Sequence, residues 1–176
     1  MRCTRIDTRE LHRDRWTRLR HDTVRWENGV QAQFSVIERM AGAAVLPIAK
    51  DGTIVLVREF KYALGEYSLE AEAGGIEEGE APLAAAQREL AEEVGLAATT
   101  WIEFGRVNPL TAALRSPVHL FLARGLSPCA TNPDETEFLE RVEMKLSEAI
   151  RLVETGGITG AGTCVLLLRA ARQLGV

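Results

Sequence analysis

Three glutamates on one face of a predicted helix constrain this chain more than any other feature. The helix is expected over Pro82–Val94, because its proline suits a first turn and Gly95 is placed to end it. Glu92 and Glu93 follow Glu89 at three and four residues, so the three carboxylates project from neighbouring positions on the helix. In the second half of a helix the macrodipole disfavours each anion by roughly 0.3–1 kcal/mol, and like-charge pairs cost about 0.2–0.5 kcal/mol more. A sequence selected for helix stability alone would avoid this pattern, which therefore indicates a function.

An excess of acidic residues surrounds this helix. Ten glutamates and one cation, Arg88, lie between positions 61 and 106. Arg88 can pair with Glu92 and with Glu80, and these pairs would hold the glycine-containing loop 74–79 against the helix. Clustered carboxylates without a histidine or thiolate nearby suit a hard cation such as Mg²⁺ or Mn²⁺. A hydrated acidic surface is the alternative that charge alone would favour.

The rest of the chain mixes strand and helix patterns without regular βαβ order. Apolar or β-branched runs between turn residues predict eight strands: His21–Trp26, Gln31–Ile37, Ala43–Ile48, Thr53–Arg58, Tyr67–Ala73, Thr100–Val107, Val118–Ala123 and Phe138–Met144. A hairpin turn is expected at Asn28-Gly29. Two more helices are expected over Ser147–Glu154, capped by Ser147, and over Ala161–Leu174. This order predicts an α+β fold, a sheet sandwich with helices packed outside.

Composition sets broad limits on the class of protein. The 176 residues have room for one core, and 46% hydrophobic with 26% charged residues exclude disordered, collagen-like and coiled-coil classes. No apolar stretch approaches the roughly 20 residues that a membrane-spanning helix needs. The absence of a secretory signal and the three scattered cysteines fit a reduced, cytoplasmic setting. A net charge of −4 gives no support to nucleic-acid binding, which needs a basic face.

The first 25 residues carry mixed charge. Eight arginines there alternate with four acidic residues. This mixture favours a solvated or partner-facing arm over a nucleic-acid tail. We therefore expect an N-terminal arm and β-hairpin over residues 1–37, followed by the main domain over residues 38–176.

The segment 74–96 carries a resemblance to a known family. It reads Gly-Gly-Ile-Glu-Glu-Gly-Glu, seven further residues, then Arg-Glu-Leu-Ala-Glu-Glu-Val-Gly-Leu. This resembles the complete signature of the Nudix hydrolases, with nine motif positions matched without a gap: Gly74, Glu80, Arg88, Glu89, Leu90, Glu92, Glu93, Gly95 and Leu96. More weakly, segments 57–63, 69–74, 120–126 and 134–140 resemble the ADP-ribose or nucleoside-diphosphate-sugar pyrophosphatase branch. The resemblance implies an α/β/α sandwich around a mixed sheet, and Mg²⁺-dependent hydrolysis of a nucleoside diphosphate linked to another group.

The resemblance also implies roles for individual residues. Glu89 and Glu93 would be the principal metal ligands, Glu92 an additional or water-mediated one, and the backbone carbonyl of Ala73 a further one. Four other motif positions would be supporting or structural: Arg88, Glu80, Gly74 and Gly95.

The substrate side is less constrained. Arg58, Lys61 and Glu70 are the candidate contacts, with ordinary surface charge as the alternative for the two cations. Lys61 stands where the branch usually has arginine, and Glu72 where it usually has proline or a small residue. Lysine offers a point charge in place of a bidentate fork, so the identity of the small-molecule substrate stays open. The branch usually forms dimers through its N-terminal strands, so a homodimer joined by residues 1–37 is expected.

Hydrolysis also needs a base within reach of the attacking water. This base could be Glu93 itself, or one of two acids in the turn-rich segment 131–137, Glu135 or Glu137. The resemblance favours Glu137 over Glu135. The expected catalytic residues are Glu93, Glu137, Arg88 and Glu92.

Three functions are compatible with these patterns. The first, which is the function that we expect, is a Mg²⁺-dependent pyrophosphatase that cleaves ADP-ribose or a nucleotide sugar into a nucleoside monophosphate and a phosphorylated product. The second is a Nudix enzyme for another diphosphate, such as coenzyme A, a dinucleoside polyphosphate or an oxidised nucleotide. The third is a catalytically silent Nudix-like module that binds nucleotides and regulates a partner. A silent module would be free to lose Glu89, Glu92 or Glu93, and this chain keeps all three.

Overall fold

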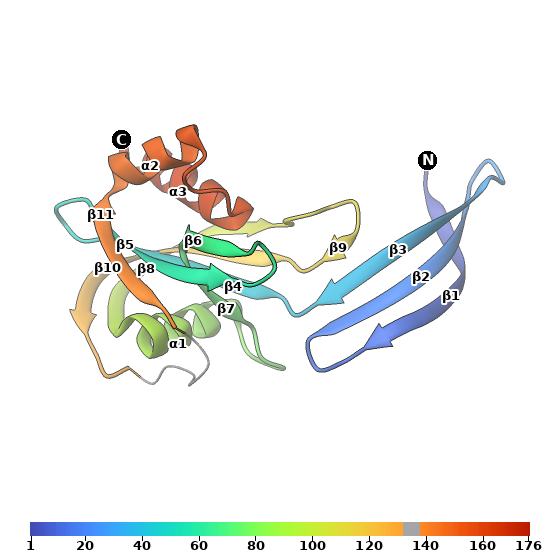
Figure 1. Cartoon of the computed structure of the whole chain (residues 1–176), viewed down its shortest axis with the longest axis horizontal. Coiled ribbons are helices and arrows are strands. Elements are labelled where there is room, and N and C mark those ends of the chain that lie inside the picture. Colours follow the sequence, from blue (N-terminus) through green and yellow to red (C-terminus); the bar gives the residue numbers. More distant parts are fainter. Residues whose placement is uncertain (132–137) are drawn as a thin grey trace. The chain divides into compact units, whose positions relative to one another are not determined.

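The computed structural model describes residues 1–131 and 138–176, which form two compact units (Figure 1). The N-terminal unit comprises Met1–Ala41 and Asn108–Pro117. The sandwich unit comprises Gly42–Val107 and Val118–Val176. Both are therefore assembled from separate stretches of the sequence.

The N-terminal unit is one sheet with the strand order β1-β2-β3-β9. Its strands are β1 (Cys3–Arg13), β2 (Thr17–Trp26), β3 (Gln31–Arg39) and the short β9 (Leu114–Arg115). Pairing is antiparallel except between β3 and β9, which run parallel. The turn expected between β2 and β3 is confirmed, with Gly29 at φ 85° and the Val30 N–H donating to Asn28 Oδ1. The arm expected at the N-terminus forms the full strand β1, all of whose residues are exposed.

The sandwich unit contains two sheets. A mixed sheet has the order β7-β4-β10-β8, with only β4 and β10 parallel, and a second, antiparallel sheet has the order β11-β5-β6. The strands are β4 (Gly42–Pro47), β5 (Thr53–Lys61), β6 (Glu66–Glu70), β7 (Glu72–Gly75), β8 (Leu96–Val107), β10 (Val118–Pro128) and β11 (Glu140–Lys145). The helices are α1 (Pro82–Val94), α2 (Leu146–Thr155) and α3 (Ala161–Leu174).

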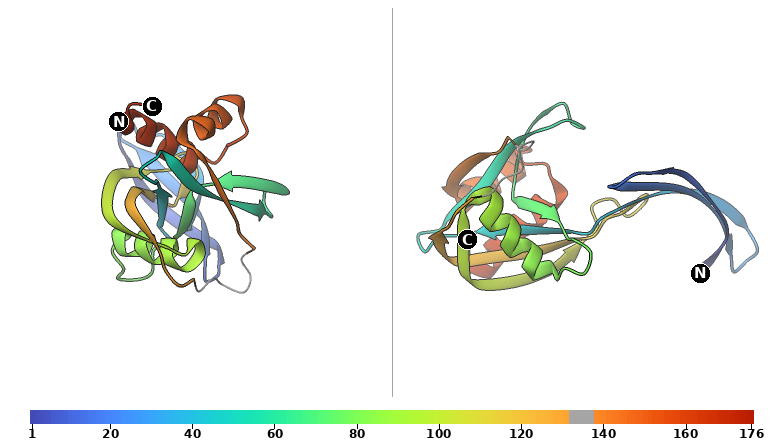
Figure 2. Two further views of the ribbon diagram at one scale, coloured as in Figure 1. Left: turned by 90° about the vertical axis from the view of Figure 1, so that its left-hand side faces the viewer. Right: turned by 90° about the horizontal axis from the view of Figure 1, so that it is seen from below.

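Helices cover both faces of these sheets, with α1 on one side and α2 and α3 on the other (Figure 2). Side chains alternate along each central strand, and in β4 Ala44 and Leu46 pack in the core beneath α2 and α3, while Ala43 and Val45 pack beneath α1. Strands buried on both faces have continuous apolar runs in their sequence, which explains why β4, β5 and β10 could be predicted. The predicted α+β fold, with an α/β/α sandwich around a mixed sheet, is confirmed.

Some element boundaries differ from the sequence-based prediction. The single strand expected over Tyr67–Ala73 is divided at Ala71, whose N–H donates to Thr163 Oγ1 of α3 at 3.1 Å and so leaves the strand ladder. Strand β11 begins at Glu140, not at residue 138. Ser147 is not the cap of α2, because the helix starts one residue earlier and its N-cap position is Lys145, without a side-chain cap bond.

Glu135 and Glu137, the candidate bases of segment 131–137, lie outside the described residues. Of the helices within residues 1–131 and 138–176, none has the length and apolar character that crossing a membrane requires.

Candidate active site

Helix α1 positions the first two carboxylates of the site. Pro82 occupies the start of the helix, and Gly95 ends it in a left-handed conformation, at φ 69°, with its N–H bonded to the Ala91 carbonyl at 3.1 Å. The face that packs on the sheet is apolar apart from one acidic residue, and its buried members are Ala85, Ala86, Glu89, Leu90 and Val94. Glu89 is 7% exposed. Burial, the largest influence on this group, raises the pKa of Glu89 although the Arg88 charge pulls it down.

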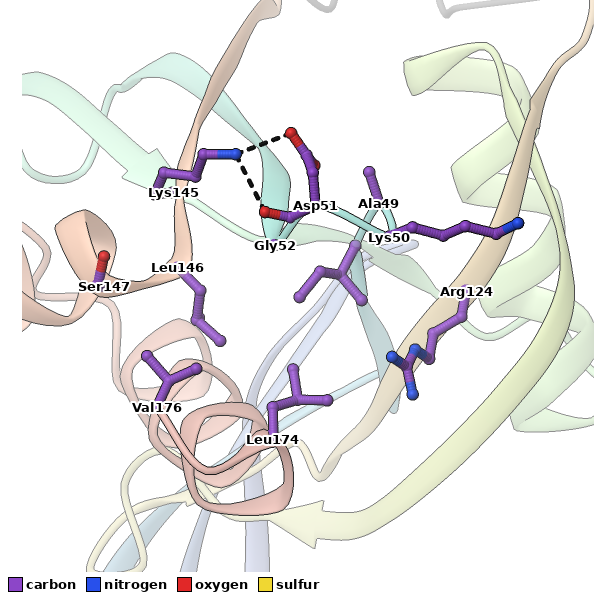
Figure 3. Close-up of a pocket in the computed structure, with 11 residues that line it drawn as sticks. Ala49, Lys50, Asp51, Gly52, Arg124, Lys145, Leu146, Ser147, Leu174 and Val176 are labelled. Atoms are coloured by element: carbon purple, nitrogen blue, oxygen red, sulfur yellow. Dashed lines mark hydrogen bonds and ion pairs between the residues drawn. The ribbon is translucent and has the colours of Figure 1, made fainter.

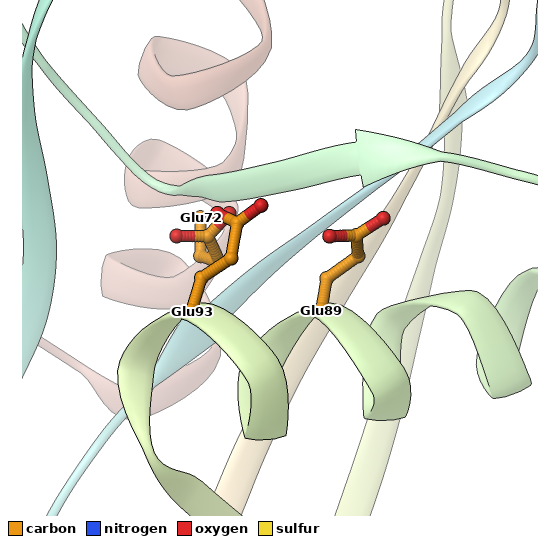
Figure 4. A group of neighbouring side chains, drawn as sticks. All are labelled: Glu72, Glu89 and Glu93. Atoms are coloured by element: carbon orange, nitrogen blue, oxygen red, sulfur yellow. The ribbon is translucent and has the colours of Figure 1, made fainter. Parts of the chain in front are cut away.

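Strand β7 adds a third carboxylate above the helix. Glu72 is 2% exposed and pairs in register with Val45 of β4. Carboxylate oxygens of Glu72, Glu89 and Glu93 lie within 4.8 Å of one another, and Figure 4 shows Glu89 and Glu93 rising from α1 toward the strand. We call these three residues the carboxylate cluster. Residues from two different elements thus converge on one small volume.

Gly74 allows strand and helix to approach this closely. A Cβ atom at position 74 would come within 3.0 Å of the carboxyl carbon and both carboxylate oxygens of Glu89, closer than nonbonded atoms approach. Its φ is not positive, so the requirement for glycine here comes from space and not from backbone conformation. The missing side chain leaves the Glu89 carboxylate room beside the β7 backbone.

Arg88 ties the loop before α1 to the helix. Its Nε donates to Glu80 Oε1 at 3.1 Å, and its Nη2 donates to Glu80 Oε2 at 3.2 Å. The same Nη2 also donates to the Gly75 carbonyl at 2.9 Å. Its other terminal nitrogen donates to Glu89 at 2.8 Å and to Glu92 at 3.3 Å. The bonds to Glu80 raise the pKa of Arg88, and Arg88 in turn lowers the pKa of Glu80. The expected pairing of Arg88 with Glu80 and Glu92 is therefore present. Glu92 forms an ion pair with Arg88 and does not belong to the carboxylate cluster.

The charge around the cluster is strongly negative. Counting only residues that the structure describes, seven carboxylates in and beside the site surround two cations, Lys61 and Arg88; the acids are Glu59, Glu70, Glu72, Glu80, Glu89, Glu92 and Glu93. Buried carboxylates are costly unless cations compensate them. The donor set is made of oxygen atoms alone, which is the set that Mg²⁺ and Mn²⁺ prefer. The site therefore fits a hard divalent cation.

A cavity of about 120 Å³ opens beside the cluster and contains two of the expected substrate-side residues. Its polar lining includes Lys61 and Glu70 together with Glu59, Glu72 and Glu93. Lys61 Nζ bonds to Glu59 and lies 3.9 Å from a Glu70 oxygen. Burial is the largest influence on the pKa of Lys61 and opposes its charge, yet these two carboxylates and Glu72 leave that pKa raised.

Arg58 lies elsewhere on β5. Val57, Glu59 and Lys61 alternate toward the cavity, so Arg58 falls on the opposite face of the strand. Its guanidinium lies 5.0 Å from the centre of the Tyr67 ring and 3.7 Å from a Glu140 oxygen. The structure therefore brings Lys61 and Glu70 to the cavity but not Arg58.

A larger cavity, of about 390 Å³, lies away from the carboxylates. It opens between the β4–β5 turn, the start of α2 and the end of α3, and Figure 3 shows Lys145 reaching Asp51 across its rim. The Lys145–Asp51 ion pair measures 2.8 Å. Among the described residues, none of those expected at the active site lines this cavity, so its size does not identify the place of the chemistry.

A comparison with known families decides the assignment. A family model described as the NUDIX domain matches residues 38–157, which is more than half of the chain. The chain belongs to the Nudix family. It is a Nudix hydrolase, and the loop 74–79 together with helix α1 and its acids Glu89, Glu92 and Glu93 is the Nudix signature in three dimensions.

Individual relatives are similar over most of the chain. An ADP-ribose pyrophosphatase of Bacillus subtilis (strain 168) is 33% identical over 150 residues, covering 81% of this chain and 78% of the relative. A methanol dehydrogenase activator of Bacillus methanolicus is 30% identical over 168 residues, covering 91% of this chain and 88% of the relative. The crystal structure of an ADP compounds hydrolase superposes with a TM-score of 0.87 at 24% identity, covering 99% of this chain and 95% of that chain, and supports the fold.

Sequence reasoning overlooked one residue of the carboxylate cluster. The sequence marks Glu72 only as unusual for this branch and predicts Glu92 as the third acid, whereas the structure places Glu72 in the cluster. An acidic residue in a strand, two positions before the first motif glycine, was the available signal. It could be interpreted only once β7 was known to lie over α1.

Proposed function

We propose that this Nudix hydrolase is a Mg²⁺-dependent pyrophosphatase that cleaves ADP-ribose or a nucleotide sugar to a nucleoside monophosphate and a phosphorylated product. The relative from Bacillus subtilis, named as an ADP-ribose pyrophosphatase, supports this substrate class. The observation that carries the metal dependence is the carboxylate cluster, with oxygens within 4.8 Å of one another in a site that has seven carboxylates and two cations among the described residues. Mn²⁺ is expected to substitute for Mg²⁺.

The residues would divide the work as follows. Glu89 and Glu93 hold the cation, and the Ala73 carbonyl and Glu92 are the further ligands that we assign. Arg88 fixes Glu89 through its 2.8 Å hydrogen bond. When bound, the cation neutralises pyrophosphate oxygens and acidifies a water molecule.

Substrate binding and proton transfer fall to neighbouring residues. Lys61 and Glu70 form the substrate side of the cavity, with the Lys61 ammonium facing a phosphate or ribose. Arg58 lies on the opposite face of β5 against Tyr67, so any contact that it makes with substrate would be outside this cavity. We assign the base that takes the water proton to Glu137, with Glu93 as the alternative.

The test is chromatographic product analysis of a nucleotide panel with Mg²⁺ and with a chelator. The panel contains ADP-ribose, a nucleotide sugar, coenzyme A, a dinucleoside polyphosphate and an oxidised nucleotide. We expect a nucleoside monophosphate from the first two with Mg²⁺ only. Glu89→Gln and Glu93→Gln should each lower turnover by orders of magnitude, and Glu103→Gln, an exposed acid of β8, serves as the matched control. Near-normal turnover of either variant at saturating Mg²⁺ would contradict the proposal.

The same assay separates the alternatives. Turnover of coenzyme A, a dinucleoside polyphosphate or an oxidised nucleotide alone would keep the reaction class and change the substrate. A silent regulatory module, the role nearest to the name of the Bacillus methanolicus relative, would bind ADP-ribose in a calorimeter without releasing product. The full carboxylate cluster favours the enzyme.

Assembly and location complete the proposal. We expect a homodimer joined through residues 1–37, with residues 38–176 as the catalytic domain, in a reduced cytoplasmic setting. Light scattering coupled to size-exclusion chromatography measures the mass directly, and a monomer at micromolar concentration would refute the dimer.

A further inference from the structure

Glu72 occupies a place where a carboxylate is costly. It lies on the short strand β7, is 2% exposed, and faces two other carboxylates of the site, Glu89 and Glu93 (Figure 4). Three carboxylates within 4.8 Å of one another, two of them buried, repel one another when ionised. A residue selected for the stability of the sandwich alone would be small or apolar here.

The side chain of Glu72 is fixed in orientation. The N–H of Ala73 donates to Glu72 Oε1 at 2.8 Å, which holds the carboxylate against its own strand. A carboxylate has about four acceptor sites, so this bond leaves capacity on the same group for a cation. The absence of a side chain at Gly74 keeps Glu89 directly beside this strand. Strand and helix carboxylates are thus held in one arrangement by separate contacts.

The two protein cations nearby are shared among several carboxylates. Arg88 bonds to three of them, and Lys61 bonds to Glu59, lies 3.9 Å from Glu70 and also interacts electrostatically with Glu72. Their combined charge of two is much smaller than the charge of the seven carboxylates among the described residues. A divalent cation at the carboxylate cluster would remove much of this excess.

We propose that Glu72 is a further carboxylate ligand of the metal centre, supplied by β7 beside Glu89 and Glu93 of α1. This inference rests on the proposed metal dependence and specifies its ligand set. Affinity for a hard cation increases with the number of charged ligands, so this centre binds its cation before any nucleotide arrives. Glu72 is then a ligand and not only a counter-ion of Lys61.

The experiment is a Mn²⁺ titration of the full chain without nucleotide, in which electron paramagnetic resonance measures free Mn²⁺. Glu72→Gln should weaken Mn²⁺ binding by about 10–100-fold, comparable to the reference variant Glu89→Gln. Glu59→Gln is the matched control, because it removes one negative charge from the same cavity but lies outside the carboxylate cluster. It should weaken binding by no more than about fivefold.

The outcomes separate this inference from the proposed function. If Glu89→Gln weakens binding and Glu72→Gln behaves like Glu59→Gln, the ligand role of Glu72 is overturned and the metal centre stands. If the unmodified chain does not bind Mn²⁺ without nucleotide, the inference is overturned, and product analysis with Mg²⁺ and with chelator decides the proposed function separately.

Thermal unfolding in chelator supplies a second readout that a purely structural role would not reproduce. Glu72→Gln relieves repulsion in the metal-free protein, so its melting temperature in chelator should rise while its gain on adding Mn²⁺ shrinks. Should Glu72→Gln fail to fold, Glu72→Asp keeps the charge but withdraws the carboxylate, and unchanged Mn²⁺ affinity in that variant would also overturn the inference.

Discussion

Gly74→Ala separates the geometry of the site from the stability of the fold. The added Cβ would overlap the carboxylate of Glu89, which is the end of a flexible side chain and can move aside. Moving it disrupts the 2.8 Å bond from Arg88 and the spacing of the carboxylate cluster. The substitution should therefore affect activity more than folding.

The size of both effects follows from the structure. Overfilling a packed interior lowers the free energy of unfolding by about 1–3 kcal/mol. Because the Glu89 carboxylate can move aside, we expect a loss near the lower end of this range for Gly74→Ala. A misplacement of about 1 Å in a catalytic arrangement lowers rates by about 10²-fold. We expect a loss of about 1 kcal/mol in the free energy of unfolding and a loss of at least about 10²-fold in kcat/KM.

Urea denaturation and steady-state kinetics with Mg²⁺ measure the two quantities. Gly162→Ala is the matched control, because a Cβ at that position of α3 meets nothing within 4 Å. It should leave kcat/KM unchanged and stabilise the helix by up to about 1 kcal/mol. A Gly74→Ala protein with kcat/KM within about threefold of the unmodified chain would refute the requirement for close approach of β7 to Glu89.

Three further substitutions test other parts of the site. Lys61→Ala should raise KM more than it lowers kcat in steady-state kinetics, because a remote phosphate contact acts equally in ground and transition states; an unchanged KM would remove Lys61 from the substrate side. Arg88→Ala should lower the free energy of unfolding, measured in urea, by about 2–3 kcal/mol, because it leaves several carboxylates and a carbonyl without their hydrogen-bond donor. Substitution of an exposed arginine, Arg124→Ala, should change this free energy by no more than about 0.5 kcal/mol. Equal effects of the two substitutions would contradict the role of Arg88 in joining the loop 74–79 to α1. Glu137→Gln should lower kcat by about 10²–10⁴-fold and Glu135→Gln much less, and small equal effects on kcat would return the base role to Glu93.

Parts of the fold that depend on local patterns were predictable from the sequence. Helix α1 begins and ends where Pro82 and Gly95 indicate, and β4 is recognisable by its apolar run. Strand β1 was not predictable, because backbone pairing with β2 and cross-strand ion pairs such as Glu10–Arg18, at 2.8 Å, hold it without an apolar pattern. The division between β6 and β7 depends on a bond to Thr163, 92 residues away in sequence, which no local pattern reveals.

The contacts of the site likewise fall into those that are local in sequence and those that depend on strand pairing. Arg88 and its partners lie within one loop and one helix, so spacing alone related them. The membership of Glu72 in the carboxylate cluster depends on pairing between β7 and β4, which places the strand above α1. The meeting of Lys61 with Glu70 likewise depends on pairing between β5 and β6. Contacts across strands therefore remained beyond sequence reasoning, whereas contacts within the motif did not.

The discontinuous N-terminal unit has a consequence for shortened forms of this protein. Residues 108–117 return to complete its sheet, and β9 pairs with β3 through Ile37 with Leu114 and Glu38 with Arg115. The chain therefore passes between the two units three times, after residues 41, 107 and 117. Removing the first 41 residues would leave the backbone of segment 108–117 without its sheet, as an open edge that other chains can extend. Proteolytic removal of residues 1–41 should consequently yield a product that aggregates instead of a monodisperse catalytic fragment.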